Sequence, residues 1–195
     1  FGKSNFYNGV ATQSLRFNDN DSNYLSRTPS GAGNRRTFTW SAWIKRTNLD
    51  ANVVGSSDSS IFSAGDSNDI SVLRFLSQLT PAGAGGDQVT DQLEIYTYYT
   101  STTTDYSEEL NKSFRDVASW YHIVFSVDTT QASAGNRIKY YVNGTLQTAV
   151  SQYYAQIPQD YDFNFNNTVA HNIIKITDHR KRFYHLLWNG GIHAL

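Results

Sequence analysis

Residues 137–150 read RIKYYVNGTLQTAV, and this stretch decides the fold. Its centre is Asn143-Gly144, and the side chains on both sides alternate between apolar and polar. Asn-Gly between two alternating segments is the strongest short signature of a β-hairpin, because a type I′ turn needs positive φ at both central residues. We therefore expect strands over 137–142 and 145–150, joined by a two-residue turn.

The same period-two pattern recurs along most of the chain. It is longest over 37–46, where Phe38, Trp40, Ala42 and Ile44 share one face. Segment 120–128 is apolar on both faces, which is typical of a central strand covered on both sides. Further strands are expected over 14–18, 24–26, from 61 onward, 71–77, 92–99 and 170–176. Polar loops are expected over 47–60, 100–118 and 151–168.

Composition supports an all-β protein that forms one domain over residues 1–195. The 16 Lys and Arg nearly balance the 17 Asp and Glu, so the net charge of −1 gives no electrostatic footprint for nucleic acid or an anionic membrane. The chain has no Cys, which excludes disulfides, thiolate metal sites and a cysteine nucleophile. Short strands, polar turns and no convincing helix predict an antiparallel two-sheet β-sandwich of the jelly-roll type.

Several motifs resemble one family. They are SLRFN at 14–18, YLSRTP at 24–29, GNRRTFTWSAWIKR at 33–46, SWYHIV at 119–124 and NRIKYYVNG at 136–144. Together they resemble laminin-G-like domains of the concanavalin A-like lectin/glucanase superfamily. The nearest likeness is to copies in virion structural proteins of tailed phages, marine phages and cyanophages among them.

The resemblance implies a laminin-G-like jelly roll with its core over 13–176. The closing segment 177–195 departs from the pattern, because such domains usually end with an Asp-Gly segment, an aliphatic strand and an ending similar to I-D-G-Q-A-L. Here the last residues read FYHLLWNGGIHAL from Phe183 to Leu195. We expect 177–195 to be the least family-like part of the chain and to be locally rearranged.

The sequence gives little support to catalysis, although the resembled fold hosts glycoside hydrolases. Those enzymes need two carboxylates about 5–9.5 Å apart. No E-x-D-x-E pattern exists, Glu94 stands between apolar neighbours, and Glu108-Glu109 and the Asp160/Asp162 pair fall in expected loops. No G-x-S-x-G elbow exists, and His122 is expected to be a packed structural residue. The chain is therefore expected not to be an enzyme.

Metal binding has one candidate that the resemblance strengthens. Asn18–Ser22 and Asp66–Asp69 are oxygen-rich, as hard cations prefer, and laminin-G-like domains often carry Ca²⁺ at the rim. Asp19 and Asp21 are the first candidate Ca²⁺ ligands, while turn chemistry explains both loops equally well. His179, His185 and His193 are weaker transition-metal candidates. The basic cluster 178–182 is expected to be a solvated surface.

Aromatic residues on strand faces opposite the expected core are the more useful functional clue: Trp43, Tyr96, Tyr98, Tyr121 and Tyr141. Rigid amphipathic rings suit protein interfaces and sugar stacking alike. A third reading is that loops 47–60 and 100–118 fold over them.

These observations favour a non-enzymatic virion structural protein, in capsid decoration or in a tail or fibre. Its expected location is the extracellular particle, and its expected partners are other virion proteins and copies of itself. The main alternative is a carbohydrate-binding module that recognises host-surface glycans, and a glucanase-like hydrolase comes third. No cofactor other than the Ca²⁺ is expected.

Overall fold

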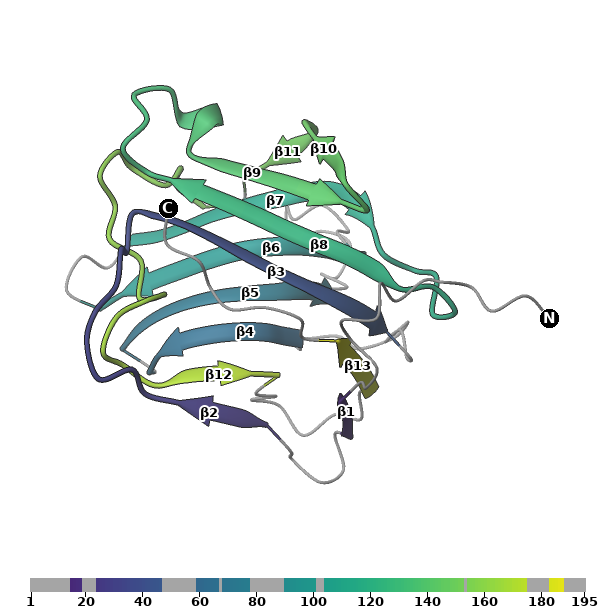
Figure 1. Ribbon diagram of the computed structural model, residues 1–195. Coiled ribbons are helices and arrows are strands. Elements are labelled where there is room, and N and C mark those ends of the chain that lie inside the picture. The colour runs from purple at the N-terminus through teal and green to yellow at the C-terminus, as the bar shows by residue number, and fades with distance from the viewer. Residues whose placement is uncertain are drawn as a thin grey trace, which may run out of the picture.

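The computed structural model describes residues 15–18, 24–46, 59–66, 68–77, 90–100, 104–152, 154–174 and 183–187. These residues form two antiparallel sheets that face each other (Figure 1). Sheet A has six strands in the order β1-β13-β3-β8-β9-β10, and sheet B has seven in the order β11-β7-β6-β5-β4-β12-β2. The all-β sandwich expected from the sequence is confirmed.

The strands of sheet A are β1 (Leu15–Asn18), β3 (Thr37–Arg46), β8 (Tyr121–Asp128), β9 (Ile138–Val142), β10 (Thr145–Gln147) and β13 (Phe183–Leu187). The strands of sheet B are β2 (Leu25–Arg27), β4 (Ser59–Gly65), β5 (Asp69–Ser77), β6 (Thr90–Tyr99), β7 (Thr104–Ser113), β11 (Val150–Ser151) and β12 (His171–Ile173). One 3-10 turn, Ala134–Asn136, is the only helical element in the described part of the chain. No described helix is long and apolar enough to span a membrane.

The Asn-Gly hairpin forms as predicted between β9 and β10. Val142 pairs with Thr145, and the two turn residues have φ of 52° at Asn143 and 78° at Gly144. The Asn143 side chain also accepts a hydrogen bond from the His122 amide at 2.8 Å. This bond ties the turn to the neighbouring strand β8.

Two segments differ from their predicted structure. The segment expected as a single strand over 145–150 divides: β10 stays in sheet A, while β11 joins sheet B by pairing Val150 with Leu110. The expected polar loop 100–118 contains the ten-residue strand β7, whose TDYSEELNKS sequence hides its alternation because both faces carry polar side chains.

The core lies between the sheets and is dominated by aromatic rings. Trp40 stacks on Phe125 with ring centroids 5.4 Å apart and on Phe62 at 6.1 Å. Phe163 and Phe165, from the expected loop 151–168, enter the same core with no exposed surface. This loop therefore acts as a strap that completes the packing between the sheets.

The strap is anchored by two adjacent arginines. Arg35 Nε donates to the Phe163 carbonyl at 2.6 Å, and Arg36 forms an ion pair with Asp162 at 2.9 Å. Hydrogen bonds and an ion pair therefore fix the strap beside the first residues of β3.

The closing segment is described only over β13. This strand lies between β1 and β3, pairing Leu186 with both Leu15 and Ile44. The remaining residues of 177–195 lie outside the described part of the chain.

Candidate functional site

The five aromatic residues singled out from the sequence lie on three different surfaces. Trp43 and Tyr141 are on the outer face of sheet A, and Tyr96 and Tyr98 are on the outer face of sheet B. Tyr121 points inward and packs against the core, so its placement on an outer face was wrong. One surface cannot combine all five.

Tyr121 points inward because of its register in β8. It lies opposite the buried Ile44, and its ring packs edge-on against Phe114 with centroids 5.1 Å apart. The opposite face of β8 is half-buried rather than covered, which corrects the prediction that this strand is enclosed on both sides. The Tyr121 hydroxyl accepts a hydrogen bond from the Asp116 backbone amide at 3.2 Å.

The outer face of sheet A carries a continuous group of apolar and aromatic side chains, which we call the aromatic face: Trp43, His122, Val124, Tyr141 and Leu146. Strand register places them side by side, because Trp43 lies opposite His122, Val124 opposite Tyr141, and Tyr141 opposite Leu146. The Trp43 and His122 rings stack with centroids 4.9 Å apart and planes at 24°. Leu146 is 45% exposed and the other four are half-buried.

Burial lowers the pKa of His122 below its usual value, which favours the neutral ring at neutral pH. His122 was expected to be a packed structural residue, and no pattern in the sequence predicts that it stacks on Trp43. Lys45 and Lys139 occupy outward positions of the same sheet, at its two ends. Asp128 also points outward, but it is the last residue of β8, away from the centre, where Thr130 and Gln131 bind its carboxylate and lower its pKa. The centre of the aromatic face therefore has no charged side chain in the described outward positions of β3, β8 and β9.

The two tyrosines on sheet B have a different environment. The Arg74 guanidinium lies over the Tyr96 ring, 4.3 Å from its centroid, and Tyr154 contacts the same ring at 5.6 Å. Desolvation is the main cause that raises the Tyr96 pKa, and Asp105 adds to it. Tyr98 lies opposite Ile70 and Asp105. The prediction that 100–118 folds over these tyrosines as a loop was wrong, because these residues include strand β7, which pairs beside β6. Most of the other predicted covering loop, 47–60, lies outside the described residues.

Two carboxylates meet on this outer face of sheet B. Glu94 lies directly opposite Glu109 on the neighbouring strand, a pairing of two acids that can be compared with the acid pair of a glycoside hydrolase. Both side chains are buried, with 1% and 4% exposure, and Glu94 is bound by Arg74 in an ion pair. Asp160 and Asp162 both form ion pairs with Arg36.

The metal candidates fare unevenly. Asp19, Asp21, His179 and His193 lie outside the described residues, and the side chain of His185 is not among those described. Asp66 accepts hydrogen bonds from the Asn68 and Asp69 amides at 2.8 and 3.2 Å, which lower its pKa and form a tight turn.

A polar cavity of about 420 Å³ adjoins this turn. Tyr99, Asn164 and Arg35 line it together with Asp66 and Asp69. No group of three or more His, Cys, Asp or Glu suited to a metal ion occurs in the described ranges.

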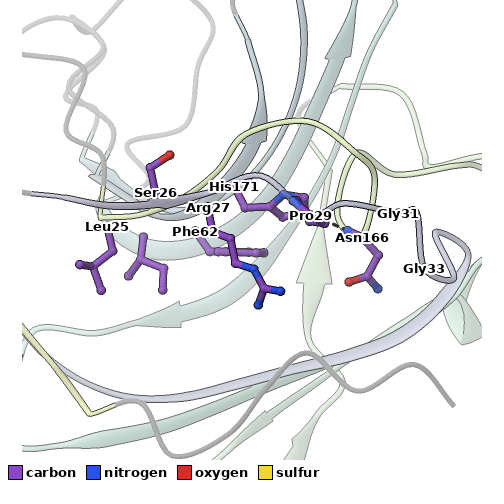
Figure 2. Close-up of a pocket in the computed structure, with 10 residues that line it drawn as sticks. Leu25, Ser26, Arg27, Pro29, Gly31, Gly33, Phe62, Asn166 and His171 are labelled. Carbon is purple, nitrogen blue, oxygen red and sulfur yellow. Dashed lines mark hydrogen bonds between the residues drawn. The ribbon is translucent and has the colours of Figure 1, made fainter.

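A larger groove of about 560 Å³ was not foreseen from the sequence. It lies beside β2 and β12 (Figure 2) and is lined by Leu25, Ser26, Arg27, Pro29, Gly31, Gly33, Phe62, Asn166, His171 and Ile173. The YLSRTP segment at 24–29 forms one wall of the groove, and the sequence indicates only its resemblance to a family motif. The register of β12 with β2 and β4, which assembles the groove, leaves no local trace in the sequence.

The fold and these surfaces can now be set beside known proteins. No curated protein matches the chain. The model of the family described as the concanavalin A-like lectin/glucanases superfamily matches residues 18–172, which include most strands of both sheets and most of the core. The fold fits carbohydrate-binding or protein-interaction roles. The chain belongs to the concanavalin A-like lectin/glucanases superfamily.

Proposed function

We propose that this chain is a non-enzymatic structural protein of a tailed-phage virion, acting in capsid decoration or in a tail or fibre through protein–protein contacts. The observation that carries the proposal is the aromatic face of sheet A. The virion context rests on the motif likeness of 14–18, 24–29 and 33–46 to phage proteins. The expected location is the extracellular particle, with neighbouring virion proteins and copies of the same chain as partners.

The aromatic face has the properties of a protein interface. Trp and Tyr supply large contact areas and lose little side-chain entropy when they are fixed, and interface cores are poor in charge. The Trp43–His122 stack is already held by β3–β8 pairing, so binding need not order it. A net charge of −1 gives little repulsion between copies. A stable contact centred here should bury at least about 1,000 Å² in total.

The test begins with particles. Mass spectrometry of purified virions should detect the chain, and cross-links should connect sheet A with a neighbouring protein. In a reconstitution assay, Trp43→Ala should reduce incorporation at least about tenfold, as expected for a central aromatic anchor. Tyr98→Ala, on sheet B, is the matched control and should incorporate normally. Absence of the chain from particles would refute the virion role, and equal loss in both variants would refute the aromatic face as the interface.

A carbohydrate-binding module is the second candidate, because the same half-buried rings could stack on sugars of a host-surface glycan. A glycan array separates the two readings. Strong binding to a defined glycan, lost in Trp43→Ala and retained in Tyr98→Ala, would favour this alternative. A β-glucan hydrolysis assay tests the non-enzymatic part of the proposal, and turnover that Glu94→Gln abolishes would overturn it.

A further inference from the structure

The edge of sheet B offers a second surface, separate from the aromatic face. In the described part of the chain, sheet B ends on β2, whose three residues are all exposed. An exposed edge strand presents unpaired backbone groups that can accept another strand. The 560 Å³ groove lies directly beside this edge (Figure 2).

Hydrogen bonds between β12 and β4 determine which backbone groups of β2 are free. The Gly65 amide donates to the Ala170 carbonyl at 3.1 Å, and the Ile174 amide donates to the Ile61 carbonyl at 2.9 Å. In an antiparallel ladder, the N–H and C=O of one residue point to the same side, and successive residues alternate. The even-numbered residues of 170–174 therefore bond to β4, and the odd-numbered ones point to β2.

The register then fixes the orientation of β2. His171 lies opposite Arg27, and Ile173 lies opposite Leu25, so these two residues of β2 point their backbone groups at β12. The N–H and C=O of Ser26 consequently point away from the sheet. A strand added at this edge would form its paired hydrogen bonds with Ser26.

Side chains alternate in the opposite sense. Figure 2 shows Leu25 and Arg27 pointing to one side of β2 and Ser26 to the other. Leu25 is 47% exposed, and Arg27 makes no ion pair with any described residue. The groove therefore contains an apolar position and a guanidinium two residues apart, over the buried ring of Phe62.

His171 adds no second charge to this groove. Its Nε2 accepts a hydrogen bond from the backbone amide of Asn166 at 3.1 Å, and its Nδ1 lies 2.8 Å from the Val169 carbonyl. These partners require the neutral ring with the proton on Nδ1, and burial lowers the pKa of His171 accordingly. Among the described residues that line the groove, Arg27 is the one cation.

We propose that β2 is a docking strand for an extended peptide segment of a partner protein, which pairs antiparallel with it and places an acidic side chain beside Arg27. If one peptide residue pairs with Ser26, its two neighbours direct their side chains into the groove. Antiparallel pairing puts the preceding residue beside Arg27 and the following residue beside Leu25. The recognised pattern is acidic–any–apolar, with backbone bonds giving affinity and the groove giving specificity.

A second copy of this chain fits the edge less well. If β2 paired with its own copy about Ser26, Arg27 would lie opposite Leu25 of that copy. Neither guanidinium would then gain a carboxylate. The charge of the groove therefore favours a different, acidic segment. This inference does not depend on the proposed function, because it uses neither the aromatic face nor a virion partner.

The test uses the full chain and short fluorescent peptides in an anisotropy titration. A peptide with an Asp-Thr-Leu centre should bind, and one with Lys-Thr-Leu should bind at least about fivefold more weakly. N-methylation of the central Thr should abolish binding, because that amide faces Ser26, whereas N-methylation of the following Leu should be tolerated, because that amide faces away. Arg27→Glu should reverse the charge preference, while Lys139→Glu, on sheet A, should not.

Thermal unfolding of each variant separates lost binding from lost folding. Reversal of preference in a folded Arg27→Glu protein, together with the N-methyl pattern, would support the proposal. Three results would overturn it: no binding at millimolar peptide, binding that is insensitive to the central N-methyl group, or equal affinities of Arg27→Glu for both peptides. Sedimentation that shows dimers abolished by Ser26→Pro would favour self-pairing instead.

Discussion

Glu108 offers the sharpest test of how this sandwich is held together. Its side chain points between the sheets from β7, opposite Ile95, and is 6% exposed. The Tyr140 hydroxyl donates to its main-chain carbonyl at 3.1 Å, so the segment is fixed across the core. Desolvation raises the pKa of Glu108 from 4.5 to about 7.

The sign of the effect follows from proton binding. Between these two pKa values the folded protein holds the proton and the unfolded chain releases it, so the free energy of unfolding falls as pH rises. A change from 4.5 to about 7 corresponds to about 3.4 kcal/mol in full. About 2.5 kcal/mol of it is lost between pH 5 and pH 8.

The perturbation is Glu108→Gln, which keeps the shape of the side chain and removes its titration. Urea unfolding of both proteins at several pH values from 5 to 8 gives the difference in unfolding free energy, in which all other titrating groups cancel. We expect Glu108→Gln to gain about 2.5 kcal/mol relative to the native chain over this range. Asp66→Asn is the control, because backbone hydrogen bonds lower the Asp66 pKa, so this carboxylate titrates below the range and its removal should not reproduce that gain. Parallel pH profiles for the native chain and Glu108→Gln would refute the reasoning.

Three further predictions test the charges and backbone of the fold. Asp91→Asn should lower the free energy of unfolding by about 3–5 kcal/mol in urea unfolding. In the native chain Arg46 is 1% exposed and lies 2.7 Å from the Asp91 carboxylate, so the substitution leaves it as an unpaired buried charge. Gly144→Ala should lower the free energy of unfolding by about 1 kcal/mol, because φ is positive at this position although the added Cβ meets open space. Gly135→Ala is the control: its Cβ also meets open space and its φ is not positive, so stability should hardly change. Gly65→Ala should cost more than Gly144→Ala in thermal unfolding, because its Cβ would lie 1.9 Å from the Asp69 carbonyl oxygen.

The elements that could be predicted from the sequence are those whose signal is local. The hairpin at Asn143-Gly144 depends on the φ preference of two adjacent residues, and β3 on simple alternation. Strand β7 lacks such a signal. Its inner face includes Glu108, and its outer face includes Glu109 opposite Glu94. Polar residues therefore lie on both faces of a strand whose middle is buried.

The division of 145–150 between the two sheets illustrates a second limit. Alternation continues through the segment and predicts that Val150 ends the strand that begins at Thr145. The Asn111 amide instead binds the Ala149 carbonyl at 2.9 Å, and Val150 pairs with Leu110 in sheet B. A change of sheet depends on a distant pairing partner, which the pattern of one strand does not contain.

The candidate surfaces follow the same rule. Period two shows which residues of one strand share a face, yet a surface is made by neighbours on different strands. Trp43 meets His122 only through the register of β3 with β8, and Arg27 enters a groove only through the register of β2 with β12. Tyr121 was misplaced for the related reason that Trp120 and His122 are also aromatic, so the composition of β8 does not tell its inner face from its outer one. Its position opposite the buried Ile44 does distinguish them, so cross-strand pairing, more than ring content, decides which side chains reach an outer surface.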